Sequence, residues 1–119
     1  MNYKKKNELF KKFQEERRIL LKTLNKNIYE LRLKQLEDDY NALVKLETHV
    51  TALTKELNYL QTKKNKPITR KIKDARDKHK IAKKNRTIKV RLALRKLKED
   101  AKIANKQLRD SFKASLKSL

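Results

Sequence analysis

Glycine is absent from this sequence, and proline occurs once, at Pro67. Without glycine, the positive-φ turns of compact β and α/β folds are hard to build, so its absence points away from those classes. Cysteine is absent as well, which excludes disulfide bonds and thiolate metal sites. No apolar run approaches the about 18 residues that a transmembrane helix needs. These absences favour an all-α protein without a membrane span.

Signals for export are also missing. No apolar segment follows the N-terminal lysines in the manner of a secretory signal peptide. We therefore expect a cytoplasmic or intravirion protein that is not secreted. Binding to an anionic membrane surface is a weak alternative, because such helices favour tryptophan or phenylalanine beside their lysines and the chain has no tryptophan.

Motifs for chemistry are missing too. The chain has no glycine-rich phosphate loop, no Cys/His metal spacing and no HExxH. The serines lie near the C-terminus, remote from both His49 and His79. We expect no enzymatic activity, no cofactor, no small-molecule substrate and no metal site.

Positive charge dominates what is present. The formal net charge is +21, and 41% of the residues are charged. Residues 63–98 hold 17 Lys or Arg against Asp74 and Asp77 only. A helix with that charge repels itself, so it favours an anionic partner.

The first half of the chain predicts one long helix over residues 1–66. Its best apolar pattern lies in the acidic segment 36–60, where positions three and four apart suit a heptad: Leu43, Leu46, Val50, Leu53, Leu57 and Leu60. Leu36 and Tyr40 extend this pattern less well. A heptad predicts left-handed packing against another helix.

Pro67 marks the single predicted break. Lys66 precedes a proline and is expected outside the α region, Asn65 suits a left-handed C-cap, and Pro67 suits the first turn of a new helix. A kink in one continuous helix is the alternative. We favour an antiparallel, coiled-coil-like hairpin, because folding about Pro67 places residue i near residue 134 − i and sets the acidic segment beside the basic one. A homodimer could use the same complementarity.

Residues 67–119 predict the second, strongly basic helix. Its seam is an apolar stripe at helical spacing, comprising Ile68, Ile72, Ala75, His79, Ala82, Arg86, Val90, Ala93, Leu97, Ala101, Ala104 and Leu108. Arg86 is the unusual member. On the predicted register it meets Glu47 or Thr48, which suggests a half-buried Arg86–Glu47 pair, unless Arg86 extends to solvent.

Two further sets on the second helix are candidates for binding. The predicted nucleic-acid-binding residues lie off the seam: Lys71, Arg76, Lys80, Lys83, Lys84, Arg91 and Arg95. A second apolar line, nearly opposite the seam, predicts contact with another protomer or a host protein through Ile81, Ile88, Leu92 and Ile103. Incidental exposure of these four is the alternative.

The expected function is sequence-independent binding of DNA or RNA phosphates as a structural part of a larger assembly. Ribosome-associated proteins and small phage nucleoid or virion proteins have this general character, and the sequence does not choose between RNA and DNA. The alternative is a coiled-coil scaffold or adaptor that docks on an acidic protein.

Overall fold

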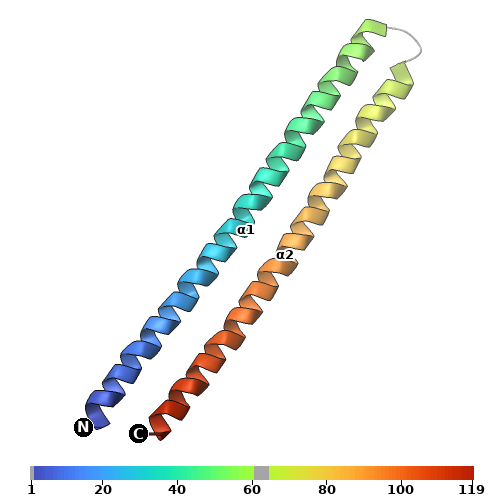
Figure 1. The fold of residues 1–119 in the computed structure, drawn as a ribbon. Coiled ribbons are helices and arrows are strands. Elements are labelled where there is room, and N and C mark those ends of the chain that lie inside the picture. Colours follow the sequence, from blue (N-terminus) through green and yellow to red (C-terminus); the bar gives the residue numbers. More distant parts are fainter. Residues whose placement is uncertain (1, 61–64) are drawn as a thin grey trace. The chain divides into compact units, whose positions relative to one another are not determined.

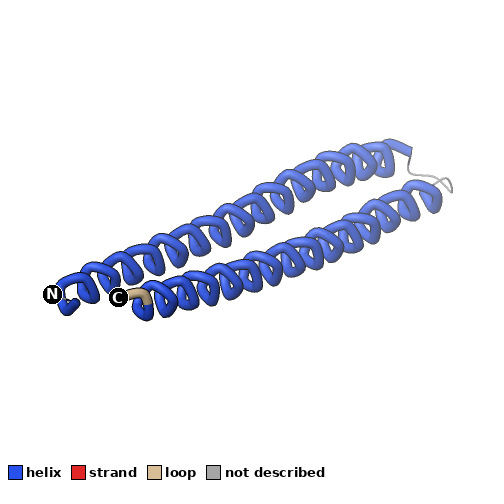
Figure 2. The backbone as a smooth tube through the Cα atoms, turned by 60° about the horizontal axis from the view of Figure 1, so that its bottom comes forward, coloured by secondary structure: helices blue, strands red, loops and turns tan. Residues whose placement is uncertain are grey.

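The protein is an antiparallel helical hairpin, as predicted. The computed structural model describes residues 2–60 and 65–119. Helix α1 covers Asn2–Leu60 and helix α2 covers Asn65–Lys117 (Figure 1). Among the described residues, only Ser118 and Leu119 lie outside the two helices (Figure 2). A chain with no glycine and with one proline at a helix start offers few sites at which a helix would break.

The break lies a little earlier than the sequence predicted. Helix α1 ends at Leu60 and α2 begins at Asn65, ahead of the predicted division between residues 66 and 67. Asn65 and Lys66 are both helical, so the predicted C-cap role for Asn65 and the non-helical Lys66 are wrong. Pro67 does lie in the first turn of α2. Its missing N–H is harmless there, because the first N–H groups of a helix have no intrahelical acceptor.

The chain divides into two compact units, each containing a segment of both helices. Residues 1–31 and 92–119 form the terminal unit, and residues 32–91 form the central unit. Each unit is described by itself below.

An aromatic cluster joins the two helices in the terminal unit. The Phe13 and Phe112 rings stack with their centroids 4.5 Å apart, and the Phe10 ring lies 6.3 Å from that of Phe112. The Asn2 side chain donates a hydrogen bond to the carbonyl oxygen of Leu119 at 3.4 Å, so the two chain ends lie side by side. Stacked and tilted rings at these distances contribute more stability than the burial of their surface area alone.

The register of the hairpin differs from the prediction by nine residues. The numbers of contacting residues add to 125 both for Phe13–Phe112 and for Asp39–Arg86, not to the predicted 134. The reason is the position of the turn. The midpoint between Leu60 and Asn65 is 62.5, and twice that value is 125. Folding about Pro67 placed the centre of the hairpin too far along the chain.

The seam of α1 in the central unit also differs from the heptad prediction. Leu36, Tyr40 and Leu43 are 67%, 67% and 44% exposed, so their placement in the seam is wrong. The predicted Leu46, Val50, Leu53 and Leu57 do turn inward, and the side chain of Leu60 lies outside the described part. The half-buried or buried positions of this α1 segment are Gln35, Asp39, Ala42, Leu46, Val50, Leu53 and Leu57.

An 11-residue repeat explains this shift. The predicted stripe of α2 is half-buried or buried at every position except Ala82, and it repeats at residues 68, 79, 90 and 101. Helices stay in contact only if their inward faces share one period. The inward positions of α1 accordingly repeat at 35, 46 and 57. Eleven residues in three turns is 3.67 per turn, so the left-handed packing inferred from a heptad does not follow.

Candidate nucleic-acid interface

All seven predicted phosphate-binding residues are exposed on α2. Arg95 belongs to the terminal unit, and the other six belong to the central unit. With 100° of rotation per residue, five of those six fall within about 100° of one another, namely Arg76, Lys80, Lys83, Lys84 and Arg91. Lys73 and Lys66 lie in the same arc, and both were missed by the sequence analysis, although their spacing was available there. We call Lys73 and the five predicted residues the basic row, which leaves out Lys66 at the start of α2.

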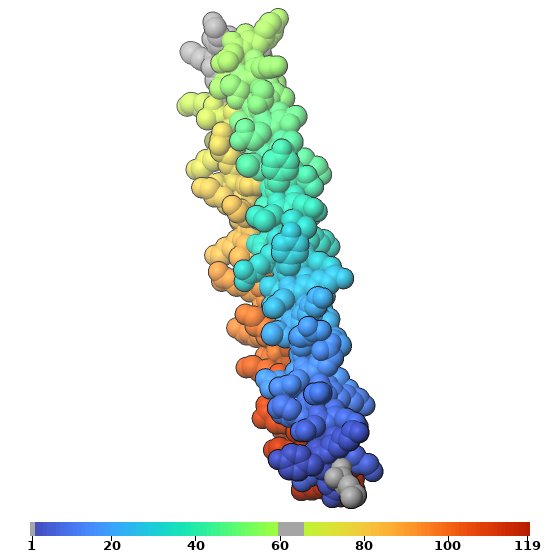
Figure 3. Space-filling model, turned by 90° about the vertical axis from the view of Figure 1, so that its left-hand side faces the viewer, coloured from blue at the N-terminus to red at the C-terminus, as the bar shows by residue number. Residues whose placement is uncertain are grey.

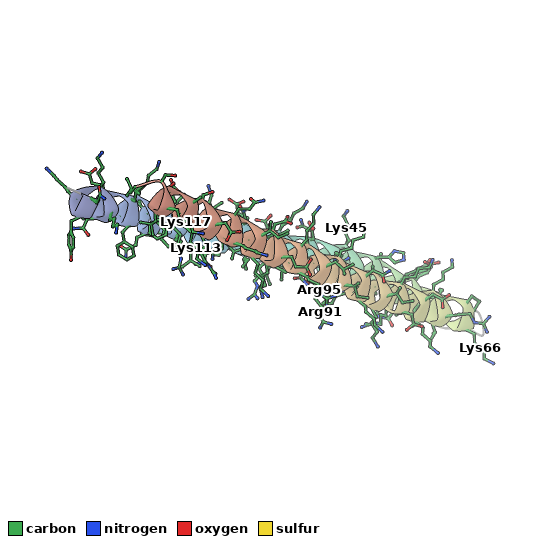
Figure 4. The ribbon with its side chains drawn as sticks, turned by 90° about the horizontal axis from the view of Figure 1, so that it is seen from below. Lys45, Lys66, Arg91, Arg95, Lys113 and Lys117 are labelled. Carbon is green, nitrogen blue, oxygen red and sulfur yellow. The ribbon has the colours of Figure 1, made fainter. Side chains whose placement is uncertain are left out.

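Lys71 does not share the face of the basic row. It is about 140° from Arg76 around the helix. It lines a groove on the other side of the central unit, together with Lys45 and His49 of α1 and with Lys78 and His79 of α2. Figure 4 shows Lys45 and Arg91 on opposite sides of the hairpin. The central unit therefore carries two cationic sides, and the basic row occupies one of them.

His49 and His79 both line the groove on the Lys71 side, together with Asp74. Within the described residues, no group of three or more His, Cys, Asp or Glu side chains is arranged to hold a metal ion.

The cations of the basic row have no anionic partner in the described part of the chain. Its two ion pairs within 4.0 Å are Arg18–Glu15 and Arg86–Asp39, and neither includes a residue of the row. The predicted charge complementarity between the helices therefore takes the form of one cross-helix ion pair. Asp77 lies beside the row, four residues after Lys73 and three before Lys80, but it forms no ion pair within 4.0 Å among the described residues.

A polar layer interrupts the seam of the central unit. Arg86 Nε donates to Asp39 Oδ1 at 2.8 Å, and the two side chains are 25% and 21% exposed. Gln35 Nε2 donates to Thr87 Oγ1 at 3.3 Å, and that hydroxyl in turn donates to the carbonyl oxygen of Lys83. Arg86 is half-buried and ion-paired, as predicted, but Glu47 as its partner is wrong.

This layer fixes the register of the hairpin. Arg86 Nη2 is buried without an acceptor among the described residues. Sliding the helices would also strand the charges of Asp39 and Arg86 against apolar side chains, which is costly. Buried polar groups in helical seams commonly specify register in this way.

Two exposed apolar sets lie outside the seam. The predicted line on α2 is exposed at all four positions, with Ile81 and Ile88 in the central unit and Leu92 and Ile103 in the terminal unit. Its role in binding a partner stays a prediction. The second set, on α1, was missed because three of its members, Leu36, Tyr40 and Leu43, had been assigned to the heptad seam. We call it the α1 strip: Leu33, Leu36, Tyr40, Leu43 and Val44.

No family model matches this sequence, and no curated protein and no solved structure shows significant similarity to it. Neither described helix contains an apolar stretch long enough to cross a lipid bilayer.

Proposed function

We propose that this chain is a non-enzymatic protein that binds nucleic acid through its phosphates, largely independently of base sequence, as part of a larger assembly. The observation that carries the proposal is the basic row. It presents six exposed cations on one arc of α2, with no carboxylate within 4.0 Å among the described residues. Phosphates attract such a surface whatever the base sequence, and released counterions supply much of the affinity.

The dimensions of the row suit a phosphate backbone. From Lys73 to Arg91 a helix rises about 27 Å at 1.5 Å per residue. One strand of a DNA duplex presents about eight phosphates over that length. Six cations can thus meet a comparable number of phosphates along one side of α2.

The surroundings of Arg86 support binding without readout of bases. Arg86 with its neighbour Asn85 is the pair in α2 best suited to base contacts. The guanidinium of Arg86, however, is held at the seam by Asp39. Asn85 lies about 180° from Arg76, away from the basic row. The row itself consists of Lys and Arg side chains, which phosphates attract whatever the base sequence.

The test compares a variant in which four cations of the basic row are neutralised with a control variant in which four other cations are neutralised. The row variant carries Lys80→Gln, Lys83→Gln, Lys84→Gln and Arg91→Gln. The control carries four neutralisations of the opposite side of the same unit: Lys45→Gln, Lys71→Gln, Lys78→Gln and Lys89→Gln. Affinity for a random-sequence DNA duplex and for a structured RNA is measured at several salt concentrations.

We expect the row variant to lose about 3–4 units from the slope of log K against log salt, at about 0.9 per phosphate on duplex DNA. The control keeps more of the parent slope, although both variants lose the same net charge. Equal losses would show that net charge alone matters and that the row is not a site. An absence of binding by the parent near physiological salt would instead favour an adaptor for an acidic protein.

A further inference from the structure

The α1 strip is an apolar face that the hairpin leaves uncovered. Its five side chains are each between 42% and 67% exposed, and they fall within about 100° of one another on the helix. The seam of α1 uses a different arc, through Gln35, Asp39 and Ala42. Figure 3 shows the corresponding cyan segment of α1 open at the surface of the molecule. Five large apolar side chains gathered over 12 residues exceed the scatter expected on a surface.

The spacing of the strip is that of a helix–helix contact. Leu33, Leu36, Tyr40 and Leu43 are separated by three, four and three residues, which is the a/d pattern of packed helices. The pattern also has a two-fold centre at residue 38. Turned about that centre, Leu33 meets Leu43 of a second copy, and Leu36 meets Tyr40.

Charge identifies the part of the chain that a second copy can approach. Residues 65–91 hold twelve basic and two acidic side chains, so two such segments repel each other strongly. Residues 32–60 hold four basic and five acidic side chains. The strip lies within this nearly neutral stretch. The apolar line on α2 lies within basic sequence, which makes it the poorer surface for self-association.

The charges at the ends of the strip are compatible with an antiparallel pair. Arg32 precedes the strip, and Glu47 follows it at the next heptad position. In an antiparallel pair centred on residue 38, Arg32 of each copy approaches Glu47 of the other copy, which gives two complementary contacts per dimer.

We infer that the α1 strip is the contact through which two copies of this chain pair in an antiparallel dimer. If each strip residue buries about 100 Å², the apolar contact totals roughly 1,000 Å², near the lower limit for a specific interface. The contact is therefore small, and the dimer is weak. It does not depend on nucleic-acid binding, and it leaves the basic row on α2 outside the contact.

The dimer responds to salt in the opposite sense from phosphate binding. Each copy carries a formal charge of +21, and salt screens the repulsion between copies. Dimer affinity rises roughly threefold or more between about 50 and 500 mM salt, as the Debye length falls from about 14 to about 4 Å. Nucleic-acid affinity falls over the same range. The two proposals are thus tested by changes of opposite sign.

Sedimentation equilibrium of the full chain, without nucleic acid, tests the contact. The strip variant carries Leu36→Gln, Tyr40→Gln and Leu43→Gln. The matched control loses three exposed apolar side chains from α2, through Ile81→Gln, Ile88→Gln and Leu92→Gln. We expect the parent and the control to dimerise and the strip variant to remain monomeric, with the helical circular dichroism of all three unchanged. A parent that stays monomeric up to about 500 µM, or equal losses from both triple variants, overturns the inference.

Cross-linking tests the direction, because the chain has no cysteine of its own. Leu33→Cys and Leu43→Cys are prepared as separate single variants, and one of them is isotopically labelled so that their masses differ. In an antiparallel dimer, mixing and oxidising them gives the mixed disulfide in excess of either homodimer. An excess of homodimers of each variant would show parallel packing and refute the antiparallel contact.

Discussion

The Asp39–Arg86 pair gives the sharpest test of the hairpin register. Asp39→Asn removes one charge and leaves the other at the seam, where the Arg86 side chain is 25% exposed. Breaking a fully buried pair costs about 3–5 kcal/mol. Because this pair keeps partial contact with solvent, we expect about 1.5–2 kcal/mol of lost unfolding free energy.

A double-mutant cycle separates the pair from its surroundings. Asp39→Leu and Arg86→Met together replace the ion pair by apolar contacts, so the double variant recovers much of the loss, with a coupling of about 1–2 kcal/mol. The assay is urea unfolding followed by helical circular dichroism. Glu47→Gln is the control, and as an exposed substitution it changes stability by no more than about 0.5 kcal/mol.

The control also distinguishes the two registers. If residue i faced residue 134 − i, Glu47 would be the partner of Arg86, and Glu47→Gln would be the costly change. A loss from Glu47→Gln equal to that from Asp39→Asn, or a coupling near zero between Asp39 and Arg86, would refute the register.

Three other predictions concern the seam and the register. In the same urea assay, Leu53→Ala, at a site 7% exposed, lowers the free energy of unfolding by about 2–4 kcal/mol, whereas Leu43→Ala, at a site 44% exposed, lowers it by less than about 1 kcal/mol. Equal losses would support the heptad seam instead. Phe112→Ala removes the ring stack on Phe13 and speeds amide hydrogen exchange in the terminal unit, whereas Tyr3→Ala, at an exposed site, leaves exchange there unchanged. Unchanged exchange in Phe112→Ala would contradict a stabilising role of the stack. Spin labels at Lys45 and Lys78 lie closer than labels at Lys45 and Lys89, since helix axes are about 10 Å apart and 11 residues add about 16 Å of rise; the reverse order would support the register about Pro67.

The helices and the hairpin were predictable from local signals. The absence of glycine, the single proline and the apolar stripe of α2 can each be recognised within short stretches of sequence. All three indicate two long helices with one break. The basic row was predictable as well, apart from Lys73, because charge density and helical spacing suffice to find it. Lys71 lies on the other side of the central unit from the row, because a residue off the seam can lie on either side of a two-helix hairpin.

The register and the α1 seam could not be predicted in the same way. Pro67 lies in the first turn of α2 and not midway between the two helices, and this offset moved the Phe13–Phe112 and Asp39–Arg86 contacts by nine residues from the predicted register. The heptad through Leu36, Tyr40 and Leu43 is a true apolar pattern of α1. It does not face α2, and it was assigned there because spacing alone does not say which of two faces meets α2. Only the 11-residue period of α2, matched to Gln35, Asp39 and Ala42, separates those faces.

The proposed function is tested most directly by the salt dependence of nucleic-acid binding by the unaltered chain. If the six cations of the basic row each neutralise about one phosphate, the slope of log K against log salt on duplex DNA is about −5. Duplexes of unrelated base sequence give the same slope and similar affinities. A slope near zero, or an affinity that depends strongly on base sequence, would contradict binding through phosphates by this row.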